Sequence, residues 1–488
     1  MYSIPETQLY IGGKLRPAAA GRTYDNINPW TREPAGKTAA ASPEDVNEAI
    51  AAARLAFDTT DWSTNHDKRL KFVAELYGVF MANKDRLVQI ARDEVGASLA
   101  FATYAQVGLA LAGWKDLVDA YPRVNWKEDR GKRGTPGALT QRYVMREAAG
   151  VVAAITPFNV PLFVNIEKVI SAFLAGCTVI LKPSPDTPAL GAIWGEFAAQ
   201  IDLPPGVLNV ITGPEPALGE ILVTDPRVDL ISFTGSSAVG KLIMEKGAAT
   251  LKRVLLELGG KSAKIILDDA PNFAQEVASS MLVAHSGQGC AAQSRLLVPK
   301  SRYAEAVGAL KAAYAAYDGK WGNYDDPANM MGPVVSRKQM DRIKNYIDIG
   351  IAEGATLLAG GKARDDMGGF FIEPTCFVDV KNEMRIAREE IFGPVVVVIP
   401  YSDEADAVRI ANDNEYGLSG SIVTADLERG LQVANRIRTG SMSINGGRCI
   451  DCDIPFGGYK QSGLGHAWGV EGIEEYTETK IVAYRVAG

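Results

Sequence analysis

The chain has 488 residues, of which 47% are hydrophobic and 22% charged, a balance typical of globular proteins with two or three domains. Its formal net charge of -7 argues against a nucleic-acid-binding surface and against a polybasic membrane patch. Prolines and charged residues interrupt the most apolar stretch, 151–181, so we expect no membrane span. The N-terminus lacks a basic region followed by an apolar run, which predicts no secretory signal and a cytoplasmic location.

The five cysteines and three histidines restrict the possible disulfide and metal chemistry. Five cysteines in a chain of this length do not form a disulfide framework. The histidines, His66, His285 and His466, lie far apart and lack the spacing of metal ligands, so no metal site is expected. Carboxylates are therefore better candidates than histidine for acid and base catalysis.

The N-terminal region is predicted to be helical after a short strand-like arm. Ser42, Pro43 and Asp45 provide an N-cap, a first-turn proline and a capping box. Apolar residues then recur on one helical face from 46 to 57, and a second amphipathic run extends from 70 to 80.

Short apolar runs alternate with helical segments from residue 150 onward, and each run is predicted to be a strand buried on both faces. A first series comprises 151–156, 178–181, 208–212, 230–233 and 264–267, and a second begins near residue 295 with 296–299, 395–399 and 421–423. The lengths between the runs suit crossover helices. The sequence therefore predicts an α/β fold with two doubly wound parallel sheets.

One segment before the first strand series differs from both neighbours. Residues 127–136 are charged and glycine-rich, and residues 138–146 alternate as in an exposed hairpin. A protruding hairpin often makes an oligomer contact, which we weigh equally against a simple surface role.

A glycine-containing loop, FTGSSAVG at 233–240, follows a predicted strand and opens a predicted helix. Backbone amides at such a helix N-terminus can hold a pyrophosphate, and glycine permits its close approach. By itself the motif is weak, because it lacks the full dinucleotide fingerprint and a tight turn is an alternative.

Three further residues could carry chemistry. Glu257 ends an apolar run beside two glycines, where partial desolvation would raise its pKa and make it a general base. Cys290 follows the glycine-rich turn 286–289; a helix beginning there would favour the thiolate and could hold an oxyanion. Asn159 lies in a proline-flanked loop, from which its amide could donate to an oxyanion. The alternatives are a solvated carboxylate, a buried structural cysteine and a loop-capping asparagine.

The other cysteines fit a catalytic role less well. Cys177 and Cys376 lie in apolar segments and are expected in the core. Cys449 and Cys452 form a C-x-x-C pair, but no second pair or histidine completes a zinc site. A histidine five residues before Cys290 does not share its helical face, so a Cys–His dyad is not expected.

Together and in this order, the motifs resemble those of the aldehyde dehydrogenase superfamily, of the hydrolytic, non-acylating type. The matching segments are PFNVPL (157–162), LKPS (181–184), FTGSSAVG (233–240), ELGGKS (257–262), GQGC (287–290), EEIFGPV (389–395) and PFGGYKQSG (455–463). The match covers essentially the whole chain. It implies an NAD or NADP cofactor, an aldehyde substrate, no nucleic-acid or membrane partner, and a homodimer or homotetramer.

The resemblance also implies a Rossmann-like cofactor domain, a catalytic domain and a small bridging β element for oligomerisation. On this basis we place the cofactor-binding domain at 1–125 and 149–255. The catalytic domain would comprise 256–474, and the oligomerisation element 126–148 and 475–488.

Carried over residue by residue, Cys290 would be the nucleophile and Glu257 the base, while the Asn159 side chain and the Cys290 N–H would form the oxyanion hole. The thiolate would attack the aldehyde, hydride would leave to the nicotinamide, and Glu257 would activate water to hydrolyse the resulting thioester. We expect the thiol to ionise without strong help. Lys168 matches one member of the proton relay of the family.

The expected cofactor contacts follow from the same resemblance. Lys182 would contact the adenosine ribose, Ser236 the pyrophosphate, and Glu390 with Phe392 the nicotinamide ribose and ring. The other expected cofactor-binding residues are Thr156, Phe158, Ser184, Gly235, Gly240, Leu258 and Gly259.

Three positions depart from the common pattern of the family. Pro185 replaces a glutamate that often follows Lys-Pro-Ser, so we expect NADP to be used as well as NAD. His466 and Ala467 replace the usual Arg-Glu, whose glutamate commonly assists the proton relay. Glu167 stands where many relatives have an aromatic residue near the substrate tunnel.

The expected substrate follows from the tunnel positions. Val164, Ile450 and Phe456 match lining positions and are apolar, and only Arg448 near the mouth could bind a substrate carboxylate. We therefore expect an apolar aliphatic, terpenoid or aromatic aldehyde. The alternatives are a CoA-acylating semialdehyde dehydrogenase, against which the presence of Glu257 argues, and a catalytically silent binding protein on the same scaffold.

Overall fold

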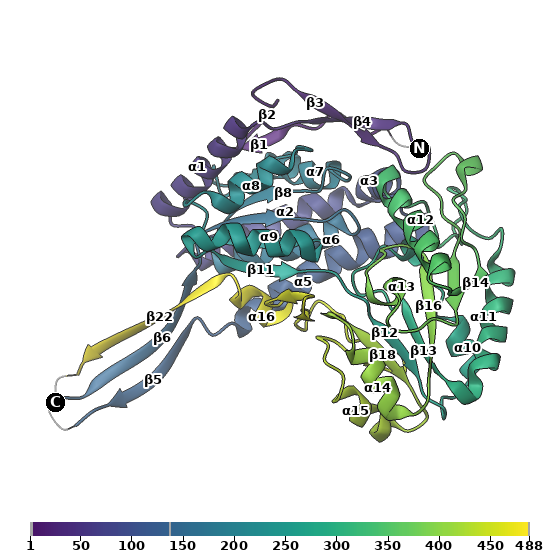
Figure 1. The fold of residues 1–488 in the computed structure, drawn as a ribbon. Helices are drawn as coiled ribbons and strands as arrows, with labels where there is room; N and C mark the ends of the chain where they lie inside the picture. The colour runs from purple at the N-terminus through teal and green to yellow at the C-terminus, as the bar shows by residue number, and fades with distance from the viewer. Residues whose placement is uncertain (1–2, 136–137, 487–488) are drawn as a thin grey trace.

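The structure is a computed structural model that describes residues 3–135 and 138–486, and two large sheets dominate it (Figure 1). The first sheet has the strand order β2-β1-β9-β8-β7-β10-β11-β21. Its strands are β1 (Leu9–Ile11), β2 (Lys14–Arg16), β7 (Val151–Ile155), β8 (Thr178–Lys182), β9 (Leu208–Val210), β10 (Leu230–Thr234), β11 (Arg253–Glu257) and β21 (Gly463–Leu464). The strands from β9 to β11 pair in parallel, as the sequence predicts.

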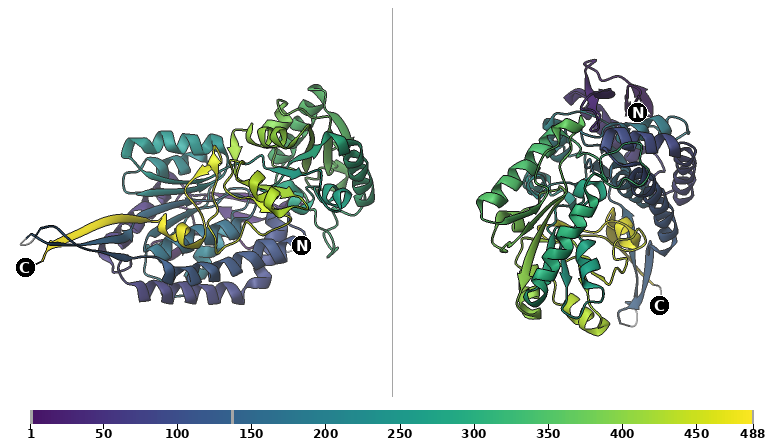
Figure 2. Two further views of the ribbon diagram at one scale, coloured as in Figure 1. Left: turned by 90° about the horizontal axis from the view of Figure 1, so that it is seen from below. Right: turned by 90° about the vertical axis from the view of Figure 1, so that its right-hand side faces the viewer.

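Helices pack on both faces of the first sheet (Figure 2). They are α1 (Pro43–Thr59), α2 (His66–Ala82), α3 (Lys84–Val95), α4 (Leu99–Phe101), the π-helix η1 (Ala102–Leu109), α5 (Ala110–Ala120), α6 (Pro161–Ala175), α7 (Ala189–Ala198), α8 (Pro216–Thr224) and α9 (Ser237–Gly247). Because successive strand residues point to opposite faces, Val152 and Ala154 pack with α2, α5 and α6, whereas Val151 and Ala153 pack with α1 and α8. The predicted capping box of Ser42 and Asp45 is present at the start of α1.

The second sheet has the order β14-β15-β16-β13-β12-β18-β19 and is parallel apart from the β14–β15 pair. Its strands are β12 (Ala263–Ile266), β13 (Arg295–Pro299), β14 (Thr356–Ala359), β15 (Thr375–Val378), β16 (Val395–Tyr401), β18 (Gly420–Val423) and β19 (Ser443–Ile444). The predicted α/β class with two parallel sheets is therefore confirmed. The assignment of the run 264–267 to the first series is wrong, because this run forms β12 of the second sheet. An apolar run predicts a buried strand but does not say which sheet the strand joins.

Helices also cover both faces of the second sheet. They are α10 (Phe273–Ala278), α11 (Tyr303–Tyr317), α12 (Arg337–Ala352), α13 (Arg385–Arg388), α14 (Glu404–Asn412) and α15 (Leu427–Ala434), and α16 (Gly469–Glu474) follows nearer the C-terminus. The short strands β3 (Thr23–Ile27) and β4 (Pro34–Ala39) form one hairpin, and β17 (Tyr416–Gly417) pairs with β20 (Tyr459–Lys460).

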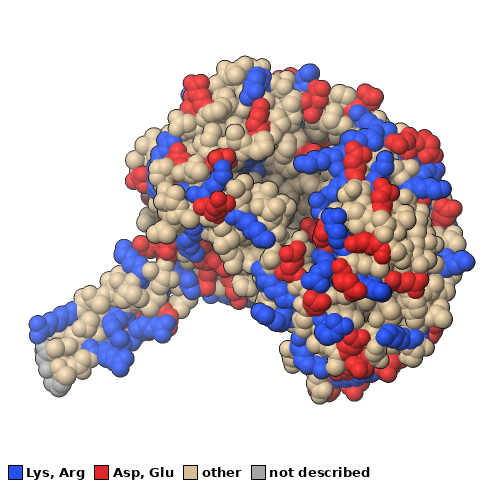
Figure 3. All heavy atoms as spheres, in the orientation of Figure 1, with Lys and Arg blue, Asp and Glu red and all other residues tan. Residues whose placement is uncertain are grey.

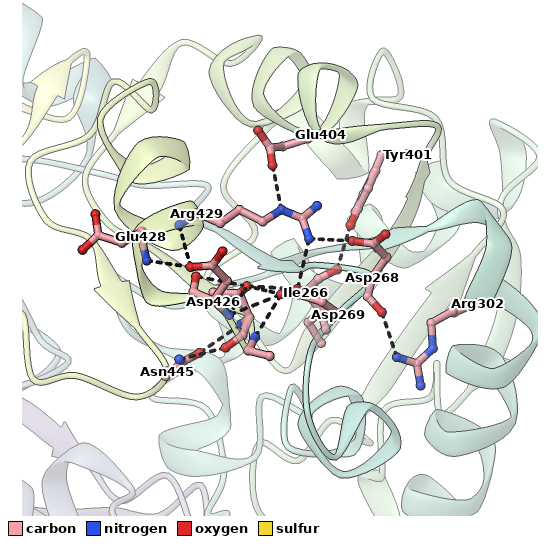
Figure 4. A network of polar contacts seen from close by, with 12 residues as sticks. Ile266, Asp268, Asp269, Arg302, Tyr401, Glu404, Asp426, Glu428, Arg429 and Asn445 are labelled. Atoms are coloured by element: carbon pink, nitrogen blue, oxygen red, sulfur yellow. Dashed lines mark hydrogen bonds and ion pairs between the residues drawn. The ribbon is translucent and has the colours of Figure 1, made fainter.

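A network of ion pairs lies at the carboxyl end of the second sheet (Figure 4). Arg429 of α15 pairs with Asp268 at 2.8 Å, with Asp269 at 3.2 Å and with Glu404 of α14 at 2.9 Å. The Thr424 hydroxyl donates to Asp269 as well. These charges pair with one another, so the network fixes α14 and α15 to the carboxyl ends of the strands.

An arm of antiparallel strands projects from the body of the molecule (Figure 1). It comprises β5 (Lys127–Arg133), β6 (Thr140–Ala148) and β22 (Thr477–Arg485), in the order β22-β6-β5. The predicted hairpin is thus confirmed, although Pro136 at its tip lies outside the described residues. The contribution of the arm to an oligomer stays a prediction.

The carboxyl ends of the strands in the first sheet face the amino ends of the strands in the second sheet. Glu257 ends β11 of the first sheet, and the chain then enters β12 of the second sheet at Ala263. Cys290 precedes β13, and Glu390 precedes β16. Residues after the strands of the first sheet therefore meet residues before the strands of the second. Among the described residues, no helix combines the length and apolar character that a membrane crossing requires.

Candidate active site

Cys290 lies in a turn between the 3-10 helix η4 (Ala284–Gly287) and β13. The possibility that a helix begins at Cys290 is wrong, so no helix dipole acts on its thiol. The turn instead uses left-handed backbone at His285 (φ 50°) and Ser286 (φ 52°), which is a strained conformation for non-glycine residues. Gly287 is also left-handed, and a Cβ there would lie 2.2 Å from the carbonyl oxygen of Gly393. This backbone presents a half-buried thiol to the space between the sheets.

The thiol of Cys290 and the carboxyl of Glu257 interact directly. Burial raises the pKa of Glu257 to about 8, although nearby Lys168 and a hydrogen bond from the thiol lower it. Burial, followed by the negative charges of Glu257 and Glu390, raises the pKa of Cys290 well above its usual value. The expectation that the thiol ionises without strong help is therefore wrong. Glu257 is the group placed to accept the thiol proton, as a general base must be.

Asn159 reaches the nucleophile turn from the loop between β7 and α6. Its side-chain Nδ2 donates to the carbonyl of Gln288 at 3.0 Å, two residues before Cys290. An asparagine amide carries two hydrogens, so one remains for another acceptor. The structure thus brings Cys290, Glu257 and Asn159 together, although they come from three distant parts of the sequence.

Lys168 and Glu167 form a buried ion pair on α6. The Lys168 Nζ lies 3.2 Å from a carboxylate oxygen of Glu167 and 3.0 Å from the Ser232 hydroxyl, which in turn bonds to the Tyr476 hydroxyl at 2.8 Å. Burial raises the pKa of Glu167, while the charge of Lys168 and hydrogen bonds from Lys168 and Tyr476 lower it. The sequence predicts Glu167 near the substrate tunnel, whereas in the structure its carboxylate interacts with Lys168 and Tyr476.

Glycines allow the close approach of several expected cofactor-binding segments. Ser236 is the N-cap of α9, as the loop motif predicts. A Cβ on Gly240 would lie 2.8 Å from the Leu258 side chain, and one on Gly259 would lie 2.5 Å from a Glu390 carboxylate oxygen. Glu390 accepts a hydrogen bond from the Gly260 N–H at 3.0 Å. The first turn of α9 thus packs on Leu258, and the Glu390 carboxylate packs on the two residues that follow Leu258.

The remaining expected cofactor residues lie at the ends of β7 and β8. Thr156 N–H donates to the carbonyl of Lys182 at 3.1 Å, which joins the two strand ends. Burial lowers the pKa of Lys182 to about 8, and the nearby charge of Glu215 opposes this shift. Ser184 follows in the same loop and accepts from a backbone N–H through its hydroxyl. Gly235 lies between β10 and α9, and a Cβ at this position would lie 2.4 Å from the Phe233 ring.

These residues fit a dinucleotide. The aromatic rings of Phe158 and Phe392 meet edge to face at 5.6 Å. The Thr156 hydroxyl and Oε1 of Glu257 are buried and have no hydrogen-bond partner among the residues described. Unpaired buried polar groups beside a helix N-terminus and a lysine suit a ligand with hydroxyl and phosphate groups. Figure 3 shows the molecule hollowed between its two main parts, where these segments meet.

The structure places the three expected substrate positions differently. Val164 of α6 and Phe456 are buried, and Phe456 belongs to the apolar cluster against which Cys290 packs. Ile450 is 40% exposed in a loop, so its contact with substrate stays a prediction. Phe163, which the sequence did not single out, packs on Trp468 at 4.6 Å between ring centroids.

The other cysteines occupy different surroundings. Cys177 and Cys376 are fully buried, which confirms their prediction as core residues. Cys452 lies with Asp116 and Asp451, their ligand atoms within 4.8 Å of one another, but Asp451 already pairs with the nearby Arg448. The expectation of no metal site stays a prediction.

Sequence reasoning missed two polar residues that contact the site. Gln106 donates to the carbonyl of Asn159 at 2.6 Å, and Glu215 lies near Lys182. Gln106 interrupts an apolar helical run, which is a signal that could have found it. Glu215 offers no such local signal, because its proximity to Lys182 depends on the strand order of the sheet.

Comparisons with known proteins agree over nearly the whole chain. The sequence model of the aldehyde dehydrogenase family matches residues 16–482. A crystal structure of Mycobacterium tuberculosis aldehyde dehydrogenase complexed with NAD+ is 40% identical, with a TM-score of 0.93 and 98% of each chain covered. Staphylococcus aureus betaine aldehyde dehydrogenase in complex with NAD+ is 34% identical, with a TM-score of 0.93, and the match covers 98% of this chain and 95% of that chain. The 3-succinoylsemialdehyde-pyridine dehydrogenase of Pseudomonas sp is 40% identical over 481 residues, covering 97% of this chain and 98% of that protein. The resemblance noted in the motifs is thereby confirmed, and the chain belongs to the aldehyde dehydrogenase family of NAD(P)-dependent oxidoreductases.

Proposed function

We propose that this enzyme oxidises an apolar aldehyde to the carboxylic acid with NAD(P)+ and water, through a thioester on Cys290. The observation that carries the proposal is the meeting of the Cys290 thiol, the Glu257 carboxyl and the Asn159 amide between the two sheets. A panel of aliphatic, terpenoid and aromatic aldehydes, assayed by NADH and NADPH formation, tests the substrate class. Turnover confined to charged or strongly polar aldehydes would contradict it.

The residues of the chain account for each proton and bond. Glu257 takes the proton of the Cys290 thiol, and the thiolate adds to the aldehyde carbon. The free N–H of Asn159 and the backbone N–H of Cys290 stabilise the oxyanion of the resulting thiohemiacetal. The nicotinamide, when bound near Glu390 and Phe392, supplies the hydride acceptor. Glu257 then removes a proton from the water that hydrolyses the Cys290 thioester, and the acid leaves.

The buried ion pair gives Glu257 a route for protons. Lys168 lowers the pKa of Glu257 and Glu167 raises it, so both lie within electrostatic reach of the base. Ala467 stands where the family commonly has a glutamate, and Glu167 supplies a carboxylate 3.2 Å from the Lys168 Nζ. We propose that protons leave Glu257 through Lys168 and Glu167 toward Tyr476.

Glu167→Gln is expected to shift the pH dependence of kcat/KM. Activity requires Glu257 deprotonated, so it rises with pH through the pKa of Glu257, near 8. Removing the negative charge of Glu167 lowers that pKa, so the midpoint of the acidic limb should move to lower pH. If the ion pair also carries protons, kcat should fall on the pH plateau.

The measurement is a pH profile of NADH formation for wild type and Glu167→Gln, with Glu75→Gln as the control. Glu75 forms a surface pair with Lys71, and its removal should leave the profile unchanged. A midpoint that stays in place or moves to higher pH would contradict the coupling of Glu167 to Glu257.

The choice between NAD and NADP depends on the charges around Lys182. Glu215 accepts from Arg22 through one carboxylate oxygen at 3.0 Å, while its Oε2 is buried without a partner among the described residues. Burial raises the pKa of Asp186, which disfavours its charged form. Glu215 is therefore the better candidate for the carboxylate that Pro185 does not supply.

We expect wild type to use both cofactors within about a hundredfold in kcat/KM, and Glu215→Gln to shift the preference toward NADP by about tenfold. A carboxylate repels a 2′-phosphate, while Lys182 attracts it. Pro185→Glu should shift the preference toward NAD by a similar factor. The measurements are kcat/KM and the dissociation constants of both cofactors from tryptophan fluorescence.

Glu220→Gln is the matched control, because Glu220 belongs to α8, which begins directly after Glu215, but is in an ion pair with Lys246. A wild-type preference for NAD above about a hundredfold (about 2.7 kcal/mol) would refute the interpretation of Pro185. An unchanged ratio in Glu215→Gln would show that its carboxylate does not face the ribose.

The division of the chain is proposed on the same grounds. Residues 1–125 and 149–255 contribute most of the first sheet and would bind the cofactor, and residues 256–474 contribute the second sheet and the nucleophile. Residues 126–148 and 475–488 contain the arm and would join subunits into a dimer or tetramer. The exposed side chains of Ile481 and Tyr484 on β22 support this role.

A further inference from the structure

We propose that Gln106 is a positioning residue that holds Asn159 in place as the oxyanion donor. The inference rests on the proposed function, because it assigns to Gln106 an effect that acts only through Asn159. The Nε2 of Gln106 donates to the backbone carbonyl of Asn159 at 2.6 Å.

The burial of Gln106 indicates that its amide is there to form this hydrogen bond. Its side chain is completely buried, and it is the one polar residue in the stretch 105–114. Burying an amide costs free energy unless it forms hydrogen bonds, and Oε1 of Gln106 has no partner among the described residues. The bond to Asn159 is therefore what compensates for an amide at a position where leucine or methionine would pack at lower cost.

The backbone at Gln106 is unusual as well. Residues 102–109 form the π-helix η1, whereas α4 and α5 on either side are α-helical. A π-helical segment is rare, and it changes which residues face a given side of the helix. Gly108 makes the turn possible, because a Cβ there would lie 2.8 Å from the carbonyl oxygen of Thr103. In this backbone Gln106 and its neighbour Val107 are buried together.

Asn159 is held from its other side by the nucleophile turn. Its Nδ2 donates to the Gln288 carbonyl at 3.0 Å, and Oε1 of Gln288 accepts from the Val335 N–H at 3.0 Å. The ring of His285, in the same turn, stacks on Phe101 at 4.6 Å between centroids, directly before η1. Asn159 thus bridges η1 and the turn that carries Cys290.

This two-point attachment determines where the second N–H of Asn159 points. Oxyanion stabilisation requires a donor held within roughly 0.5 Å of its productive position. Without the bond from Gln106, Asn159 keeps its side-chain bond to Gln288 but loses the bond to its backbone carbonyl, so the donor is held less precisely. The hydrogen bond of Gln106 goes to the Asn159 backbone, so its loss should change substrate capture and cofactor binding little.

The test is a double-mutant cycle with Gln106→Met and Asn159→Ala. Asn159→Ala alone should lower kcat by about a hundredfold to a thousandfold, the usual effect of losing one oxyanion donor. Gln106→Met should lower kcat by about tenfold with the aldehyde KM within about twofold. In the Asn159→Ala background, Gln106→Met should have less than about a twofold effect, because the donor that it positions is absent.

Two further readouts separate positioning from packing. Hydrolysis of an activated aryl ester by Cys290, which needs no cofactor, passes through an oxyanion and should fall in parallel with kcat. The NAD dissociation constant should stay unchanged. Asn209→Leu is the control, since Asn209 is a fully buried amide that donates to the Gly206 carbonyl in the first sheet. It should lower Tm without lowering kcat.

Multiplicative effects of Gln106→Met and Asn159→Ala on kcat would overturn the inference while leaving the oxyanion role of Asn159 intact. A lowered Tm with unchanged kcat and ester hydrolysis would overturn it too. If Asn159→Ala costs less than tenfold, the proposed oxyanion hole itself fails. Should Gln106→Met not fold, Gln106→Asn replaces it, since it keeps the amide but is one methylene too short to reach Asn159.

Discussion

Cys290→Ser is expected to lower aldehyde oxidation by at least about a thousandfold while leaving NAD binding intact. The structure sharpens the reason, because burial and the charges of Glu257 and Glu390 already raise the pKa of the native thiol. A serine hydroxyl has a far higher pKa in the same place, so Glu257 could not produce a useful concentration of alkoxide. NADH formation measures the loss, and tryptophan fluorescence measures cofactor binding.

Cys376→Ala is the control for Cys290→Ser. Cys376 is fully buried in β15 within the apolar core, so its substitution should lower stability without lowering kcat. Turnover close to that of wild type in Cys290→Ser would refute the nucleophile assignment whatever the fold.

Glu257→Gln should retain the first NADH formed by each active site but abolish rapid turnover. The neutral amide removes a negative charge that raises the pKa of Cys290, so the thiol ionises more easily than in wild type even without a base. Water has no such alternative and requires the carboxylate for its attack on the thioester. Rapid mixing should therefore show a stoichiometric burst, slower than in wild type, followed by a steady state at least about a hundredfold lower.

Alkylation of Cys290 by iodoacetamide provides an independent measurement on Glu257→Gln. Its midpoint should move to lower pH than in wild type, because the neighbouring negative charge is gone. Glu196→Gln, which removes a surface carboxylate that pairs with Arg86, should change neither measurement. Loss of the burst together with loss of Cys290 alkylation would mean that Glu257 chiefly activates the thiol in wild type.

The sequence predicts the parts of this fold that depend on local patterns. Apolar runs bounded by turn residues identify strands such as β7 and β13 because parallel strands are buried on both faces. The capping residues at Ser42 identify the start of α1 because their hydrogen bonds involve neighbouring residues only. The run 264–267 is assigned to the first series from the sequence, but it forms β12 of the second sheet. The chain crosses between the sheets just before this run, and no local pattern marks that crossing.

The candidate site divides in the same way. Cys290, Glu257 and Asn159 are identified by motifs, and the structure brings them together. Three contacts of the site join residues that are distant in sequence, so no local pattern predicts them. They are Glu167 with Tyr476, Gln106 with Asn159, and Glu215 with Lys182. The raised pKa of Cys290 was also missed, because it arises mainly from burial, which no local pattern at the nucleophile turn reveals.

The strand β21 has a mechanical consequence for the whole enzyme. It returns from the far end of the chain to pair with β11, and the Ser462 hydroxyl donates to the Gly259 carbonyl across 203 residues of sequence. The chain between β11 and β21, which contains the second sheet, is thus attached to the first sheet at both of its ends. A single proteolytic nick in this part of the chain would leave one fragment attached through β11 and the other through β21. The nicked protein should therefore migrate as one species until it is denatured.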